Sequence, residues 1–230
     1  MGLHEAVAVP CGRVVLPADL VLPEGASSVV VLASDRGAGR HLGATLDVAA
    51  VVESRGHGVV LVDLLTAAED ERDPALTGDV ALLSERLLAV CDRLETDERT
   101  RGHPLGLFAV GTAAAAALLV SARRRGRIGA VVCCDGRPDL AGDALLEVEA
   151  PTLLVIGGGD TETTARHRDA LRLLSVPHAL EILPRAAVPE PAEHLGELAA
   201  EWFSTYLPRR PPSRVPRRGP GSPPPRPSRR

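Results

Sequence analysis

Two adjacent cysteines stand where a catalytic nucleophile could lie. Cys133 and Cys134 end an apolar run that predicts a β-strand, and α/β proteins place their active sites at the carboxyl ends of strands. A thiol attacks as its thiolate, so a nearby imidazole or helix N-terminus must lower its pKa. The sequence around the two cysteines offers no such partner. The residues alone therefore favour buried cysteines that pack as small apolar groups.

Three further patterns argue against a metal or cofactor site. The four cysteines form no C-x-x-C pair and no histidine cluster accompanies them, which speaks against zinc. Gly157–Gly159 is not G-x-G-x-x-G and lies late in the chain, whereas the dinucleotide fingerprint belongs at the first strand–helix turn. Gly37–Arg40 lacks the G-K-[ST] of a phosphate-binding loop. We expect no metal and no cofactor.

Alternating strands and helices must position any site in this chain. The sequence begins with a predicted antiparallel hairpin, Ala6–Val9 with Val14–Leu22. Apolar runs predict strands at Ser28–Ala33, Val59–Val62, Leu105–Val110, Ile128–Cys133, Thr152–Ile156 and Ala179–Leu183, the first two of them buried. Helical spacing predicts helices at Leu42–Ser54, Val80–Leu94, Thr112–Arg123, Thr163–Leu174 and Pro191–Tyr206. Thr66–Asp79 is interpreted as an acidic loop, and Pro138–Leu145 as a short turn or helix. This order predicts an α/β fold: a doubly wound, mostly parallel sheet of about eight strands with helices on both faces.

Two helices carry explicit predictions about which side faces the core. In the first, Leu42, Leu46, Ala49 and Val52 share one side and are expected to point inward. In the second, the leucines at 82, 83 and 87 with the valine at 90 are expected to face in. The arginines at 86 and 93 are expected to face solvent.

The end of the chain differs sharply in composition from the rest. Pro208–Arg230 holds nine prolines, eight arginines and no acid, so it cannot bury a core and is predicted to be a disordered tail after a domain spanning 1–207. Residues 1–207 then carry 30 acids against 18 arginines, a balance of −12. An acidic body argues against a nucleic-acid-binding domain. The tail could contact nucleic acid or another anionic partner, although a solubilising role is favoured.

Two absences bear on the compartment. No apolar run approaches the roughly 18 residues that a membrane span needs. The first ten residues lack the basic and apolar regions of a secretory signal. We therefore expect a cytoplasmic protein with reduced thiols.

Several stretches, taken together, resemble the dienelactone-hydrolase-like group of the α/β-hydrolase superfamily. They are the opening hairpin, VVVLAS, VDLLT, LGLFAVGTAAAAAL, CCDGRPDLAG, PTLLVIGGGD and a final helix closing on EWF, and they cover about residues 4–206. The resemblance implies the α/β-hydrolase fold. It also implies a site in which a serine in G-x-S-x-G attacks an acyl carbon, a histidine moves protons and an aspartate orients the histidine.

Two of the three catalytic positions have changed. In the elbow segment Ala109–Ala113, Gly111 occupies the nucleophile position; glycine keeps the strained turn and removes the reacting group. Asp160 matches the acid position, although capping the next helix is the favoured interpretation of it. Val188 falls where the family has its histidine. His194 is the nearest substitute, and it is interpreted as an exposed first-turn residue.

The surrounding positions are altered as well. The family has His–Gly after its first buried strand, where this chain has Ser34 and Asp35; Asp35 would place a negative charge where an oxyanion should develop. Thr112 follows the elbow, and its N–H is the useful group. Cys134 lies at the same edge of the sheet. Arg137 matches a segment at the pocket rim, where it could bind an anionic ligand or cap the turn. Arg40 and His41 also match family positions, and surface roles are favoured for both.

Three functions remain open from the sequence. The first is a pseudo-hydrolase that binds a small molecule or a protein. The second is an active hydrolase of ester, thioester or lactone bonds that uses His194 with Cys133, Cys134 or water. The third is an accessory subunit that docks through its acidic surface or basic tail. Because a fold does not establish a function, the resemblance cannot choose among them.

Overall fold

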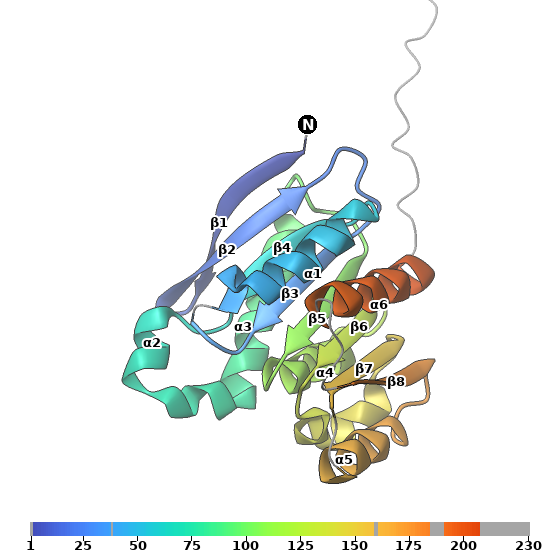
Figure 1. Ribbon diagram of the computed structural model, residues 1–230. Helices are drawn as coiled ribbons and strands as arrows, with labels where there is room; N and C mark the ends of the chain where they lie inside the picture. The colour runs from blue at the N-terminus through green and yellow to red at the C-terminus, as the bar shows by residue number, and fades with distance from the viewer. Residues whose placement is uncertain (1, 38, 159–160, 185–190, 208–230) are drawn as a thin grey trace, which may run out of the picture.

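A computed structural model describes residues 2–37, 39–158, 161–184 and 191–207 of the chain. Within these ranges, one eight-stranded sheet has the order β1-β2-β4-β3-β5-β6-β7-β8 (Figure 1). The strands are β1 Leu3–Cys11, β2 Val14–Leu22, β3 Val29–Ser34, β4 Gly58–Asp63, β5 Leu105–Val110, β6 Ile128–Cys134, β7 Thr152–Gly157 and β8 His178–Leu183. β1 and β2 form an antiparallel hairpin whose second strand pairs antiparallel with β4, and the strands from β3 to β8 are parallel. The predicted fold class is confirmed.

Helices cover both faces of the sheet. α1 (Gly43–Ser54) and α6 (Pro191–Tyr206) lie side by side over one face, and α3 (Val80–Thr96) and α4 (Ala113–Arg123) over the other (Figure 1). The long 3₁₀ segment η3 (Pro138–Glu147) and α5 (Thr161–Leu171) continue the second layer. Short connections complete the chain: η1 (Gly39–His41), α2 (Ala67–Arg72) and η2 (Pro74–Gly78). The apolar runs of β3 to β7 are buried because both faces are covered, whereas the edge strand β8 is partly exposed.

One strand lies unusually close to the helix that covers it. A Cβ added to Gly106 in β5 would lie 2.8 Å from Phe203 Cε1 and 3.1 Å from Leu207 Cδ1. The aromatic ring therefore rests directly on the backbone of the strand. Phe203 is fully buried, so the end of α6 closes this face of the core.

The inward side of α1 differs from the prediction. Val48, Ala49 and Val52 are buried, but Leu42 is 58% exposed and Leu46 is 43% exposed. The helix begins at the carboxyl edge of the sheet, so its first turn projects beyond the strands and only its later turns reach the core.

The segment 66–79 is not a loop, contrary to the prediction. It contains α2, which begins with a capping box: the Thr66 hydroxyl accepts from the Glu69 N–H, and the Glu69 carboxylate accepts from the Thr66 N–H. Arg86 in α3, which was expected to face solvent, is buried. It donates to both Glu69 carboxylate oxygens, at 2.9 and 2.7 Å, and to the Leu64 carbonyl at 2.8 Å. The ion pair with Glu69, on another helix, therefore holds Arg86 inside the protein although the periodicity of α3 predicts an exposed position.

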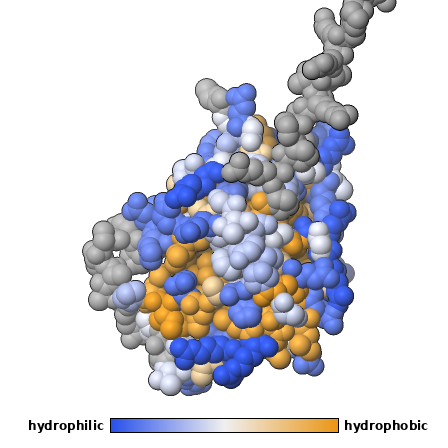
Figure 2. Space-filling view, turned by 90° about the vertical axis from the view of Figure 1, so that its right-hand side faces the viewer, coloured by the Kyte–Doolittle hydropathy of each residue, from blue (hydrophilic) through white to orange (hydrophobic). Residues whose placement is uncertain are grey.

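The two edges of the sheet are β1 and β8. Figure 2 shows the side at which β8 lies, where orange apolar surface is bordered by blue hydrophilic residues. Ile182 of β8 is 44% exposed and Leu173, just after α5, is 37% exposed. Among the described residues, no helix is long and apolar enough to cross a membrane.

Candidate functional site

The strand-to-helix elbow lies between β5 and α4, at the carboxyl edge of the parallel strands. Gly111 has a φ of +64°, a left-handed conformation that favours glycine. Its N–H donates to the Cys134 carbonyl at 3.2 Å, which ties the elbow to the end of β6. The backbone therefore has the strained turn that an elbow requires, although the residue there has no side chain.

The Asp35 carboxylate fills the space beside this glycine. Oδ2 of Asp35 accepts a hydrogen bond from the Thr112 N–H at 2.7 Å. A Cβ added to Gly111 would overlap the same oxygen and would lie 3.0 Å from the carboxylate carbon. The Asp35 carboxylate thus has two roles at the elbow. It fills the volume that a side chain at position 111 would take, and it accepts the hydrogen bond from the N–H of residue 112.

The surroundings of Asp35 act on its pKa in opposite directions. Burial raises the pKa above its ordinary value of 3.8. The hydrogen bond from the Thr112 amide opposes this rise, as do the charge of Arg36 and the Thr112 hydroxyl. The carboxylate consequently lies in a half-buried position where hydrogen bonds compensate part of its lost hydration.

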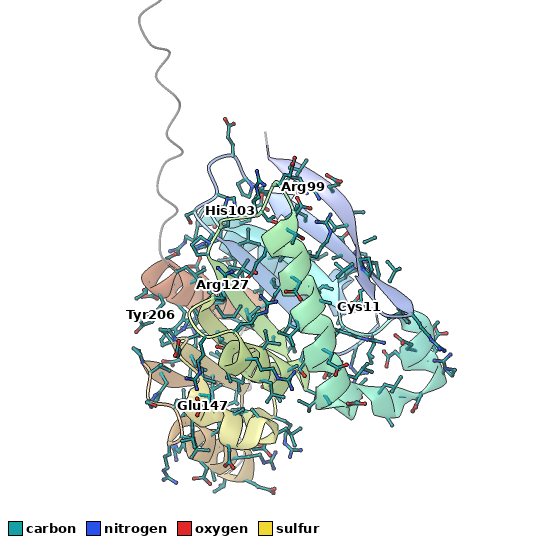
Figure 3. The ribbon with its side chains drawn as sticks, turned by 180° about the vertical axis from the view of Figure 1, so that it is seen from behind. Cys11, Arg99, His103, Arg127, Glu147 and Tyr206 are labelled. Carbon is teal, nitrogen blue, oxygen red and sulfur yellow. The ribbon has the colours of Figure 1, made fainter. Side chains whose placement is uncertain are left out.

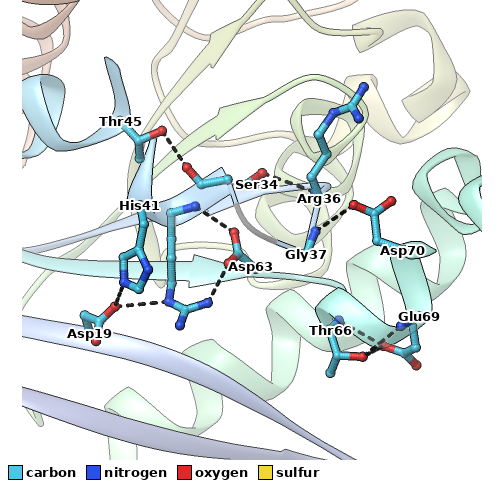
Figure 4. Close-up of polar contacts among 12 residues, drawn as sticks. Asp19, Ser34, Arg36, Gly37, His41, Thr45, Asp63, Thr66, Glu69 and Asp70 are labelled. Atoms are coloured by element: carbon cyan, nitrogen blue, oxygen red, sulfur yellow. Dashed lines mark hydrogen bonds and ion pairs between the residues drawn. The ribbon is translucent and has the colours of Figure 1, made fainter. Parts of the chain in front are cut away.

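The loop that carries Asp35 is fixed by polar contacts on either side (Figure 4). The Ser34 hydroxyl accepts from the Arg36 N–H at 3.2 Å, and the Gly37 N–H donates to Asp70 at 3.1 Å. These bonds, together with the end of β3 at Ser34, set the position from which the Asp35 side chain reaches the elbow.

Arg40 and His41 follow this loop and form a second polar group with two aspartates, and Figure 4 labels His41 with its partner Asp19. Arg40 bonds the fully buried Asp63 carboxylate through its N–H at 2.8 Å and its guanidinium at 2.6 Å. Its Nε also donates to Asp19 at 3.0 Å, and His41 Nε2 lies 2.9 Å from the same carboxylate. Arg40 therefore joins β2 and β4 to η1. The sequence analysis did not pair Arg40 with Asp63, the acid of the VDLLT stretch, although the family resemblance covered both residues.

The two cysteines do not have the properties of nucleophiles. Cys133 is 1% exposed, and burial raises its pKa to about 12. Cys134 is 6% exposed; burial and the neighbouring Asp135 charge raise its pKa well above the usual range. The Cys133 Sγ lies 3.7 Å from the Ala114 carbonyl oxygen, toward the core. Both thiols are protonated at neutral pH.

The residues after β6 form a second strained point. Asp135 has a φ of +45°, and its Oδ1 accepts from the Gly157 N–H at 2.7 Å, which links the ends of β6 and β7. Sequence reasoning missed this residue.

Arg137 is exposed and donates to Asp139 at 2.9 and 2.7 Å; these bonds raise the pKa of Arg137 and lower that of Asp139. Arg137 thus has an anionic partner from its own turn.

Of three other predicted site residues, the structure describes only one. His194 lies in the first turn of α6 and is exposed. Asp160 and Val188 lie outside the described residues. In the part of the chain that the structure covers, no group of three or more His, Cys, Asp or Glu side chains could hold a metal ion.

A cavity of about 480 Å³ lies at the opposite end of β5. Its lining includes Glu95, His103, Leu105 and Arg127; Figure 3 labels His103 and Arg127 from behind. Glu95 pairs with Arg127 at 3.8 Å and with Arg124 at 3.0 Å, so charges of both signs meet there. Because Leu105 begins β5 whereas Gly111 follows its end, this cavity is separate from the elbow.

Comparisons with known proteins place the chain in a family. No family model matches the sequence. The crystal structure of a dienelactone hydrolase from Anabaena variabilis ATCC 29413 is 38% identical, with a TM-score of 0.84, and the match covers 90% of this chain and 99% of that one. The dienelactone hydrolase-like phosphotriesterase P91 from metagenomic libraries is 17% identical with a TM-score of 0.72, a likeness of fold.

Curated relatives from Mycobacterium tuberculosis have a different name. Proteins of strains CDC 1551 and H37Rv, each named "Putative phosphoribosyl transferase", are 38% identical over 207 residues. The match covers 88% of this chain and 46% of each relative, so the chain spans about half the length of the curated relatives it matches. From its identity to the Anabaena enzyme over nearly the whole of both chains, this chain belongs to the dienelactone hydrolase family of α/β-hydrolases.

Proposed function

We propose that this chain is a non-hydrolytic member of its family that acts by binding a small molecule or a protein. The observation that carries the proposal is the Asp35 carboxylate, which holds the Thr112 N–H at 2.7 Å and fills the side-chain space of Gly111. In an acyl-transfer enzyme, that N–H must be free to stabilise the negative oxygen of the tetrahedral intermediate.

Electrostatics strengthen the argument. Two unit negative charges about 4 Å apart near a protein surface repel by about 4 kcal/mol. An oxyanion forming beside Asp35 would therefore be destabilised where an active enzyme stabilises it. Among the described residues at the elbow, none serves as a nucleophile, because Gly111 has no side chain and the thiols of Cys133 and Cys134 are buried with raised pKa values.

The alternative, a rewired active hydrolase, needs His194 to activate a thiol or a water. His194 is exposed on the first turn of α6, and the sulfur of Cys133 faces the core. These positions supply neither a short contact between base and nucleophile nor a lowered thiol pKa.

Ester turnover tests the proposal directly. The purified chain should hydrolyse a panel of p-nitrophenyl esters and lactones no faster than buffer, and His194→Ala and Asp160→Ala should change nothing. Asp143→Ala, an exposed change in η3, serves as the control. Turnover above buffer that falls in the His194 or Asp160 variant, but not in the control, would establish an active hydrolase instead.

A second candidate follows from the length of the Mycobacterium relatives. Their name describes a phosphoribosyl transferase, whereas the matched 46% is 38% identical to this chain, which has a hydrolase fold. If the name is right, the transferase activity belongs to the unmatched half. We propose that this chain could act as an accessory subunit that docks with a separate phosphoribosyl transferase.

Complex formation tests this second candidate. The unmatched half of the Mycobacterium relative, made as a separate protein, should co-elute with this chain in size-exclusion chromatography with light scattering. A parallel sample that lacks 208–230 shows whether the Arg/Pro segment is needed. Separate elution of the two proteins at micromolar concentrations, with and without that segment, would reject the accessory role.

A further inference from the structure

We propose that the Asp35 carboxylate is an internal ligand: it closes a site for a small carboxylate at the elbow, and the site opens when Asp35 withdraws. The inference rests on the proposed binding function and names the class of ligand. It concerns the described residues Asp35, Gly111 and Thr112, whose contacts are those of a bound carboxylate.

The first argument is the hydrogen bond that the Thr112 N–H donates to Asp35. The Thr112 N–H precedes α4, an eleven-residue helix, and is one of the amide donors that a helix N-terminus leaves without an intrahelical partner. At 2.7 Å its bond to Asp35 is short, as charge-assisted bonds are. The Thr112 hydroxyl also favours the ionised form of Asp35. The hydrogen-bond donors of Thr112 thus suit a carboxylate ligand.

The second argument is space, and it is independent of the first. Because Gly111 has no side chain, the elbow leaves a volume that a Cβ would otherwise take, and Oδ2 of Asp35 lies within it. The vacancy left by the missing side chain is therefore filled by a group from a loop 76 positions earlier in the chain.

The third argument concerns what holds Asp35 in place. β3 ends at Ser34, so Asp35 lies outside the strand ladder. The loop is secured at its neighbours, through the Ser34 hydroxyl and the Gly37–Asp70 bond. In the proposed opening, the Asp35 side chain leaves Thr112 while these bonds hold the loop in place. An external carboxylate and the Asp35 carboxylate repel each other, so the two should not occupy the elbow together.

Chemical rescue with formate tests the inference. The full chain, wild type and Asp35→Ala, is titrated with sodium formate up to about 0.1 M at constant ionic strength, because salt screens charge. The measured quantity is the ¹⁵N–¹H NMR shift of the Thr112 amide. The alanine variant should bind formate roughly 100-fold more tightly than the wild type, as expected when a charge-assisted bond is freed for the added anion.

Two further variants sharpen the test. Asp35→Asn keeps the shape of the side chain without its charge, and its amide oxygen should keep the Thr112 N–H occupied, so formate should bind as weakly as in the wild type. Asp143→Ala is the matched exposed control and should also behave as the wild type. Asp35→Ser repeats the truncation should circular dichroism show that the alanine variant does not fold.

Three results would overturn the inference. Equal formate shifts at Thr112 in the wild type and the truncated variant would mean that Asp35 does not close the site. No shift in a folded truncated variant would mean that no carboxylate site exists. Binding to Asp35→Asn as tight as to Asp35→Ala would mean that charge alone excludes formate. Since none of these measurements involves ester turnover, they are separate from the test of the proposed function.

Discussion

Gly111→Ala is the change that most directly tests the contact between Asp35 and the elbow. The alanine must adopt a φ of +64°, which costs roughly 1–2 kcal/mol. Its Cβ would overlap Asp35 Oδ2 and expel the carboxylate, with the loss of the charge-assisted bond to Thr112, worth about 1.5–3 kcal/mol. The free energy of unfolding should therefore fall by roughly 2.5–5 kcal/mol in total.

The chain offers a matched control for the backbone part of this cost. Gly12, in the turn between β1 and β2, has a φ of +62°, and a Cβ added there would meet nothing within 4 Å. Gly12→Ala should thus cost about 1–2 kcal/mol, the price of the left-handed conformation alone. The difference between the two alanine variants isolates the Asp35 contact.

A double-mutant cycle completes the measurement. In the Asp35→Ala background, the carboxylate is already absent, so Gly111→Ala should cost no more than Gly12→Ala. The two changes should then couple by about 2 kcal/mol in urea unfolding followed by circular dichroism, analysed by linear extrapolation. The reasoning fails if Gly111→Ala costs as little as Gly12→Ala, or if the changes at 35 and 111 add to within about 0.5 kcal/mol.

Three further predictions concern ionisable groups away from the elbow. Arg86 lowers the pKa of Glu69 from its ordinary 4.5 to about 2, so the pair should stabilise the fold above pH 4.5 and lose that contribution as the pH falls through 2. Glu69→Gln should cost about 3 kcal/mol at pH 7 and flatten the acid limb of a plot of unfolding free energy against pH. Burial lowers the pKa of His57 from 6.5, so its buried neutral ring should make the protein less stable as the pH drops below 6.5, and His57→Gln should remove that part of the pH dependence of the melting temperature. Iodoacetamide at pH 8 should leave Cys133, whose pKa is raised to about 12, unlabelled in the native protein while the half-buried Cys11 reacts first; mass spectrometry of both peptides checks the order, and equal labelling would contradict the burial argument.

The strands were predictable because burial on both faces leaves a direct mark in the sequence. The parallel strands β3 to β7 are short apolar runs buried between the helix layers, whereas the edge strand β8 is partly exposed; each predicted run falls on an observed strand. Local signals served less well in the segment 66–79, where acidic composition hid the Thr66–Glu69 capping box. That signal, T-x-x-E, was present in the sequence and was not used.

Contacts between distant segments account for the other errors. Helix periodicity placed Arg86 in solvent, but its partner Glu69 lies 17 positions earlier on another helix. The Asp35–Thr112 bond joins residues 77 positions apart. The resemblance to the family pointed to each of those positions separately, yet only coordinates could show that the carboxylate enters the volume left by Gly111. Roles for Asp160, Val188 and the tail 208–230 stay predictions, because these residues lie outside the described part of the chain.

The contact of Phe203 and Leu207 with Gly106 has a consequence for biosynthesis. A ribosome makes the chain from its N-terminus, so β5 is complete about a hundred residues before the residues that cover its backbone exist. During that interval, one face of the nascent sheet carries the apolar side chains of β3, β4 and β5 with α1 as its partial cover. Folding of this layer must therefore await the emergence of α6 from the exit tunnel. Chains that stall before that helix would present exposed apolar surface to chaperones and proteases.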